Sequence, residues 1–117
     1  METINGCVVI PPPDTSEPAS FGPDETSGSY RVLLGFFPAG EPGPPAHRHP
    51  HTDEAFYVAS GEATFLLGDR EVQVAPGTMV FVPRGMRHTV WNSGADAVHG
   101  LILISPGDAE HVFEPAE

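Results

Sequence analysis

The segment at residues 77–92 reads GTMVFVPRGMRHTVWN, and its turn residues decide the fold. Pro-Arg-Gly at 83–85 is a turn signal that separates two short runs rich in apolar and β-branched residues, 78–82 and 87–91. Each run is too short for a helix and is typical of a strand. The turn therefore places His88 early on the second of two consecutive strands.

Short runs separated by turn residues continue on both sides of this segment. Gly or Pro turns recur about every eight to ten residues, which predicts an all-β sandwich or barrel. Fourteen prolines and thirteen glycines leave no stretch with the apolar period of a helix. Several runs are apolar on both faces, which predicts strands covered by a second sheet and by a subunit partner. The expected strands are 30–37, 55–59, 62–67, 71–74, 78–82, 87–91 and 97–104.

The chain has 117 residues, enough for one domain with its own core. We expect an N-terminal strand and irregular arm at 1–29, a β-barrel at 30–105 and an acidic C-terminal tail at 106–117. The N-terminal strand is expected at 7–10. The irregular arm, 11–29, is rich in Pro, Ser, Gly, Asp and Glu.

Composition excludes two classes of partner. The chain has sixteen acidic residues and only five basic ones, all arginine. The resulting net charge of −11 argues against nucleic acid and against an anionic membrane surface as partners. The single cysteine, Cys7, cannot form an intramolecular disulfide and is expected to be a small buried apolar residue. We expect a cytoplasmic location, because no apolar run approaches the roughly 20 residues of a membrane span and the first residues lack a signal pattern.

A cluster of potential metal ligands precedes the expected strand at 55–59. Residues 47–54 read HRHPHTDE, and side chains two apart on a strand share one face, as His47 and His49 would. By the same alternation His49 and His51 are an equally good pair. Imidazoles with the carboxylate of Glu54 suit transition metals better than Ca²⁺ or Mg²⁺. Asp53 could also ligate, but a solvated turn residue explains it.

These residues resemble the two motifs of the cupin superfamily, particularly small cupins similar to quercetin dioxygenase. The first motif is His-x-His, a short gap, Glu, six residues and Gly, which the chain matches from His47 to Gly61. The motif has a further Gly before the first His, where this chain has Glu41. The second motif, Gly, five residues, Pro-x-Gly, two residues, His, three residues, Asn, matches 77–92 without a gap. The resemblance covers roughly 40–104.

The resemblance implies a double-stranded β-helix (jelly-roll) barrel with a metal centre inside it. Its ligands would be His47, His49, Glu54 and His88, holding one divalent transition metal, Fe, Mn, Ni, Cu or Zn, with coordination positions left open. The family spacing favours His47 and His49 as the pair and leaves His51 at the rim.

The family also implies a metal-dependent enzyme that acts on a small organic substrate in a dioxygenase-like reaction, with Glu54 as ligand and catalytic proton acceptor. One alternative is a redox-neutral isomerase or polyketide-type cyclase that uses the metal as a Lewis acid. Another is a non-catalytic small-molecule-binding cupin. Small cupins are commonly homodimers, and residues 7–10 could add a strand to a partner's sheet.

Three polar residues remain outside this set. His99 either lines the pocket or is a hydrogen-bonded core histidine, and His111 is expected to be exposed in the acidic tail. Asn92 belongs to the second motif, but a turn before Ser93 and Gly94 explains it without chemistry.

Overall fold

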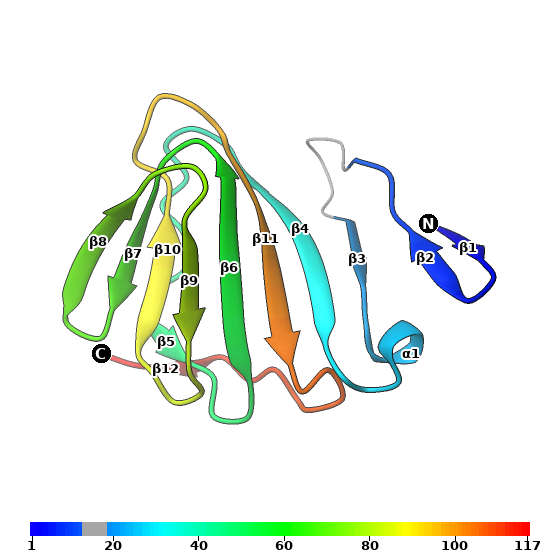
Figure 1. Cartoon of the computed structure of the whole chain (residues 1–117). Coiled ribbons are helices and arrows are strands. Elements are labelled where there is room, and N and C mark those ends of the chain that lie inside the picture. Colours follow the sequence, from blue (N-terminus) through cyan, green and yellow to red (C-terminus); the bar gives the residue numbers. More distant parts are fainter. Residues whose placement is uncertain (13–18) are drawn as a thin grey trace.

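The computed structural model describes residues 1–12 and 19–117, and nearly all of its regular structure is β-strand (Figure 1). The only helix in this part of the chain is a single turn, α1 (Pro23–Thr26). The strands are β1 (Glu2–Ile4), β2 (Cys7–Val9), β3 (Ala19–Phe21), β4 (Arg31–Phe37), β5 (His47–Arg48), β6 (Asp53–Ser60), β7 (Ala63–Leu67), β8 (Arg70–Val74), β9 (Met79–Val82), β10 (His88–Trp91), β11 (Val98–Ser105) and β12 (Glu114–Pro115).

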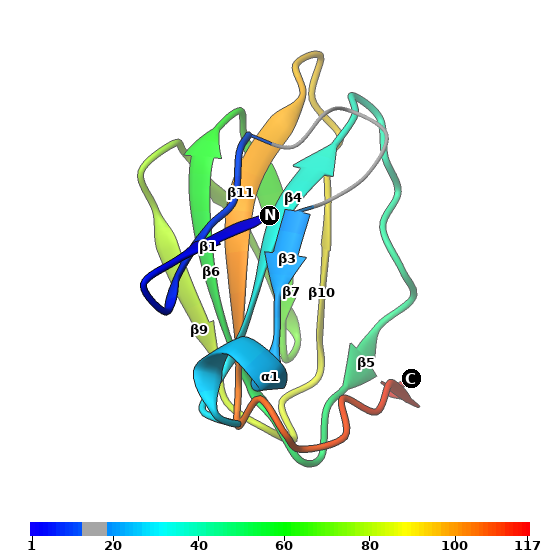
Figure 2. The same cartoon turned by 90° about the vertical axis from the view of Figure 1, so that its right-hand side faces the viewer.

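Two five-stranded sheets face each other and enclose the core (Figures 1 and 2). One sheet has the strand order β12-β5-β10-β7-β8, and the other has the order β3-β4-β11-β6-β9. Chain neighbours such as β9 and β10 belong to opposite sheets, so the chain crosses between the layers as a jelly roll requires. The all-β, double-stranded β-helix fold expected from the sequence is confirmed.

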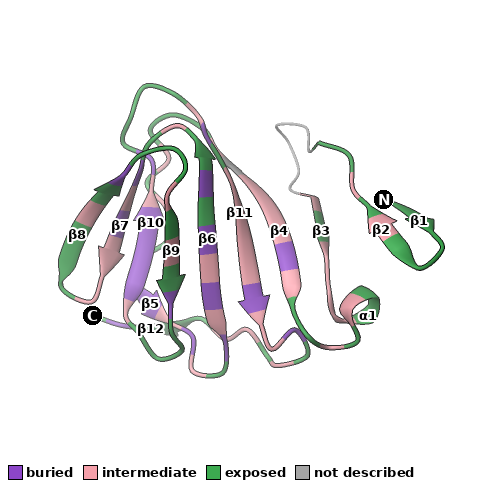
Figure 3. Cartoon of the chain, in the orientation of Figure 1, coloured by how far each residue is buried: buried purple, intermediate pink, exposed green. Residues whose placement is uncertain are grey.

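Period-two burial along the strands builds the core. On β6, Glu54, Phe56 and Val58 are buried and alternate with more exposed residues (Figure 3). Phe65 on β7 packs edge-on against Phe56 with ring centroids 5.2 Å apart. Phe65 is 1% exposed, and burial of such a side chain stabilises the fold by about 1.5–3 kcal/mol.

The apolar interior leaves little space. A cavity of about 20 Å³ lies between the sheets and is lined by residues that include Phe56, Phe65 and Val90. A single water occupies roughly this much space, so this cavity is too small for an organic molecule without repacking.

Gly61 forms the turn between β6 and β7 and could not be replaced there by another residue without strain. Its φ of +79° lies in the left-handed region. An added Cβ would come within 2.3 Å of the backbone oxygen of Ala97. The glycine of the first motif is thus required by the close approach of two backbone segments.

The N-terminal part differs from the expectation of an irregular arm. Residues 19–21 form β3, which pairs with β4 through Ala19 opposite Leu34, and α1 follows. The remaining central part of the arm, 13–18, lies outside the described residues. Residues 7–9 do form a strand, but this strand pairs with β1 in a separate hairpin, where Cys7 is exposed rather than buried. In the described part of the chain, no helix is long and apolar enough to cross a membrane.

Candidate metal centre

Four ligand-type side chains from both sheets meet between the layers. β5 and the residues that follow it supply His47 and His49, and β10 supplies His88, which lies opposite His47 in the strand register. Glu54 comes from β6 in the facing sheet. All four are buried, with exposures of 7% for His47, 2% for His49, 6% for Glu54 and 2% for His88.

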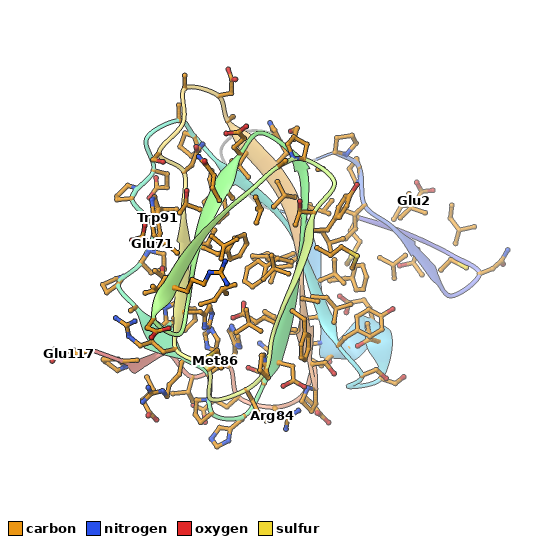
Figure 4. The ribbon with its side chains drawn as sticks, turned by 60° about the vertical axis from the view of Figure 1, so that its left-hand side comes forward. Glu2, Glu71, Arg84, Met86, Trp91 and Glu117 are labelled. Atoms are coloured by element: carbon orange, nitrogen blue, oxygen red, sulfur yellow. The ribbon has the colours of Figure 1, made fainter. Side chains whose placement is uncertain are left out.

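The Pro-Arg-Gly turn of the second motif holds the first motif in place. The backbone amide of Gly85 donates to the carbonyl of His49 at 2.8 Å. The backbone amide of Arg84 donates to Oδ1 of Asp53, also at 2.8 Å. Figure 4 shows Arg84, Met86 and Glu117 toward the same end of the barrel. The turn therefore positions both His49 and the start of β6, and with it Glu54.

The four side chains converge on a common point. One carboxylate oxygen of Glu54, Oε1, lies 2.8 Å from Nε2 of His49 and 2.9 Å from Nε2 of His88. One ligand atom from each of the four residues, His47 included, lies within 4.8 Å of the others. This is the buried convergence of three imidazoles and one carboxylate that the two motifs predict.

Backbone carbonyls set the orientation of all three imidazoles. Nδ1 lies 2.9 Å from the carbonyl oxygen of Pro45 in His47, 2.8 Å from that of Val112 in His49, and 2.9 Å from that of Met86 in His88. A carbonyl oxygen only accepts, so each Nδ1 carries the proton and each Nε2 faces the common point. Such outer hydrogen bonds are typical of metal-binding histidines.

The cluster is compatible with one divalent metal ion. His49 Nε2 is buried and makes no hydrogen bond, although Glu54 Oε1 lies 2.8 Å away. A buried polar atom without a partner is costly, and a cation among the four ligand atoms would satisfy it. Three imidazole nitrogens and one carboxylate oxygen suit first-row transition metals, but this set does not select among them.

The pKa values of the cluster follow from burial and mutual contact. Burial raises the pKa of Glu54, but the hydrogen bond with His88 and the nearby His49 outweigh it, so the pKa lies below its ordinary value. Burial lowers the pKa of His88, but the hydrogen bond with Glu54 outweighs burial, and the pKa is raised. Burial lowers the pKa of His47 and favours its neutral, metal-binding form. Metal binding requires the neutral imidazole, so it competes with protonation of His88.

Three residues considered from the sequence lie outside the cluster. His51 is exposed in the loop before β6. Asp53 forms an ion pair with Arg84, with Oδ2 and Nη2 3.1 Å apart, and this contact lowers the pKa of Asp53. His99 is exposed on β11 and lines a hollow on the outer face of its sheet, so it is neither a core histidine nor part of the barrel interior.

The expectation that His111 is an exposed tail residue is wrong. Its ring stacks on that of His49 with centroids 3.9 Å apart, and its side chain is 13% exposed. Its Nδ1 lies 2.7 Å from the hydroxyl of Thr52. Burial and the neighbouring His49 lower the pKa of His111 to about 4, so it is neutral at pH 7. The sequence does carry a signal, His-Val-Phe at 111–113 within an otherwise acidic tail.

Asn92, the last residue of the second motif, has a structural role. Its side chain is 1% exposed, and Nδ2 donates to the carbonyls of Phe37, Pro38 and Asp96 at 3.1, 3.2 and 2.8 Å. Its Oδ1 accepts from the amide of Gly94 at 3.0 Å. It ties the loop after β10 to the end of β4, as the turn interpretation expects.

Comparison with known proteins finds two curated relatives that share part of the chain. An uncharacterized protein of Streptomyces coelicolor is 36% identical over 61 residues, which cover 51% of this chain and 57% of that protein. The tetracenomycin polyketide synthase protein TcmJ of Streptomyces glaucescens is 32% identical over 60 residues, which cover 51% of this chain and 40% of that protein. The chain thus spans about half the length of the curated relatives it matches.

A solved structure and a family model extend the likeness over more of the chain. An uncharacterized Klebsiella pneumoniae protein with a double-stranded β-helix domain superposes with a TM-score of 0.71 at 22% identity, covering 90% of each chain. At this identity the superposition shows the fold. The family model of the cupin domain matches residues 34–110. Because this match covers more than half of the chain, the protein belongs to the cupin family.

Proposed function

We propose that this protein is a metal-dependent enzyme that acts on a small organic substrate with an enolic or aromatic group, in a dioxygenase-like reaction. The observation that carries the proposal is the buried cluster in which three Nε2 atoms and Glu54 Oε1 face one point. His47, His49, Glu54 and His88 would hold one ion of Fe, Mn, Ni, Cu or Zn. A redox-active ion bound there would supply electron transfer to dioxygen.

Glu54 is the proposed proton acceptor as well as a ligand. Its Oε1 lies among the imidazoles, whereas Oε2 is 4.0 Å from Nε2 of His111, outside hydrogen-bond range. Oε2 is therefore the oxygen left to take a proton from a substrate hydroxyl. The lowered pKa keeps Glu54 ionised at neutral pH, as a base requires. Substrate would approach from the end of the barrel where the cluster lies.

Oxygen consumption tests the proposal. Protein purified without added metal should contain close to one transition-metal ion per chain by elemental analysis. With a panel of enolic and phenolic compounds it should consume oxygen, and removal of the metal with a chelator should stop the consumption. Metal and compound binding with no conversion of any compound would favour a non-catalytic cupin instead.

A redox-neutral cyclase or isomerase is the second candidate. The likeness to TcmJ, whose name assigns it to a polyketide synthase, favours this reading for the substrate class. A metal such as Zn²⁺ would then polarise a substrate carbonyl as a Lewis acid. Full turnover by the zinc-loaded protein without oxygen would support this candidate and eliminate the dioxygenase reaction.

We also propose that the protein is a homodimer. Tyr57 on β6 and Met79 on β9 lie opposite each other and are 41% and 72% exposed, with Phe81 beside them at 64%. A second apolar surface lies on the β1–β2 hairpin, which projects beside β3 with Ile4 and Val9 each 48% exposed (Figure 1). A second copy of the chain would cover both apolar surfaces. A hairpin alone is marginally stable and gains stability when its apolar side is covered.

The Phe81→Glu substitution should convert the dimer to a monomer at micromolar concentration, as measured by light scattering coupled to size exclusion. A buried, unpaired carboxylate would oppose association. Gln73→Glu, an exposed position on β8 in the other sheet, adds the same charge and should leave the mass unchanged. A monomeric parent protein would refute the proposal.

A further inference from the structure

The C-terminal segment 109–116 is fastened against the end of the barrel that holds the cluster. Arg31 Nη2 donates to the carbonyl of Ala109 at 2.9 Å, and Arg87 Nε donates to that of Ala116 at 2.8 Å. Between these anchors, β12 pairs with β5, the strand that carries the first ligand (Figure 2). Ala116 is 3% exposed. The segment is thus part of the packed fold and reaches the cluster in one defined conformation.

Three consecutive residues of this segment touch the ligand set. His111 stacks on the ring of His49, and the carbonyl of Val112 accepts from Nδ1 of His49 at 2.8 Å. The ring of Phe113 lies 4.7 Å from that of His47 and 4.6 Å from that of His49, measured between centroids. The segment therefore forms one wall of the cluster.

The proton on the His111 ring can be placed from its two neighbours. The Thr52 hydroxyl lies 2.7 Å from Nδ1, and Nε2 faces Oε2 of Glu54 at 4.0 Å. A lone pair on Nε2 would face a carboxylate oxygen, which is unfavourable, whereas an N–H there is attracted to it. The favourable arrangement has the Thr52 hydroxyl donating to Nδ1 and the ring proton on Nε2. Thr52 is 1% exposed, so water does not compete for this contact.

We infer that His111 is a positioning residue of the metal centre, oriented by Thr52 and acting on Glu54. The N–H of His111 attracts Oε2 of Glu54 and so keeps Oε1 turned toward His49 and His88. Oε1 is then the oxygen that faces the metal position, and Oε2 lies beside the C-terminal segment. The inference rests on the proposed metal site, and it adds to that site a residue from outside both cupin motifs. At 4.0 Å the contact is longer than a hydrogen bond, so the attraction is electrostatic, between the N–H dipole and the charged carboxylate in a buried site.

Two substitutions separate positioning from packing. His111→Phe keeps a flat ring against His49 but removes the N–H that faces Glu54. Thr52→Val keeps the shape of the side chain but removes the hydroxyl that orients His111. His51→Ala removes an exposed imidazole from the same loop region and is the matched control.

The measurements are the affinity for Co²⁺, by competition with a chelator, and the visible absorption bands of the Co²⁺ protein, which report ligand geometry. His111→Phe and Thr52→Val should each weaken Co²⁺ affinity by about 10-fold, the lower end of the cost of losing an outer partner, because the contact with Oε2 is longer than a hydrogen bond. Both should also shift the bands in the same direction. His51→Ala should match the parent protein in both measurements.

If His111→Phe has the same Co²⁺ affinity and the same spectrum as the parent protein, the inference is overturned and the His111 ring only packs against His49. Parent values in Thr52→Val would overturn it as well, since the hydroxyl would then orient nothing. If His111→Phe does not fold by circular dichroism, Thr52→Val alone decides. Failure of the parent protein to bind Co²⁺ would instead refute the proposed function, so the two failures are distinguishable.

Discussion

The His88→Ala variant should be purified with almost no bound metal, while the parent protein carries close to one ion per chain. His88 is 2% exposed, and its Nε2 lies 2.9 Å from Glu54 Oε1 at the centre of the cluster. Water can enter the gap but is a far weaker ligand than imidazole. Affinity should fall by more than about 100-fold, the upper end of the cost of losing an outer partner. Elemental analysis of both proteins, purified without added metal, measures the difference.

Two variants in the 47–54 segment provide the control for this experiment and the outcome that would contradict the proposed ligand pair. His47→Ala should lose metal as His88→Ala does, because its ring belongs to the same cluster. His51→Ala should retain a stoichiometry near one, because the side chain is exposed outside it. Full metal in His47→Ala together with loss in His51→Ala would show that His49 and His51 are the true pair.

Gly61→Ala should destabilise the fold by more than about 3 kcal/mol, beyond the range of ordinary substitutions. The new Cβ would lie 2.3 Å from the backbone oxygen of Ala97, and backbone cannot rotate away as a side chain can. The strand that ends at this turn carries Glu54, so metal binding should weaken too. The midpoint of urea unfolding, measured on metal-free protein, gives the loss of stability.

Gly77→Ala isolates the steric contribution to this loss. Gly77 has a φ of +89°, similar to that of Gly61, but nothing lies within 4 Å of a Cβ added there. It should cost only the left-handed backbone strain, about 1–2 kcal/mol. Equal losses in the two variants would show that the contact with Ala97 is readily relieved.

The strand set could be predicted because each strand is delimited by local chemistry. Glycine and proline end one strand after another, and every expected strand from 30 to 104 is present within one or two residues at each end. The four clustered residues could be selected because the motif spacing favours His47 and His49 over His51, whereas strand alternation alone does not separate the two pairs. Their convergence depends on β5 and β6 lying in opposite sheets, which the structure shows; the family resemblance implied only a metal site inside the barrel.

The features that the sequence did not predict depend on contacts between distant segments. His111 is 62 residues from His49 in the numbering of the chain, and no local pattern indicates that their rings stack. Residues 19–21 are too few to show a strand period, and they become β3 because β4 offers a free edge. His99 follows the alternation of β11 outward, and a shift in register at His99 and Gly100 obscures that face in the sequence.

The origin of the ligands in both layers has a consequence for how the protein opens. Glu54 belongs to one sheet and His88 to the other, so an ion held by both would act as a cross-link between the halves of the sandwich. Separation of the two sheets would then require breaking a coordination bond. An ion that binds only the native state stabilises it against unfolding by RT ln(1 + L/Kd), where L is the free metal concentration. Metal binding should therefore oppose separation of the two sheets most strongly at the end of the barrel that holds the cluster.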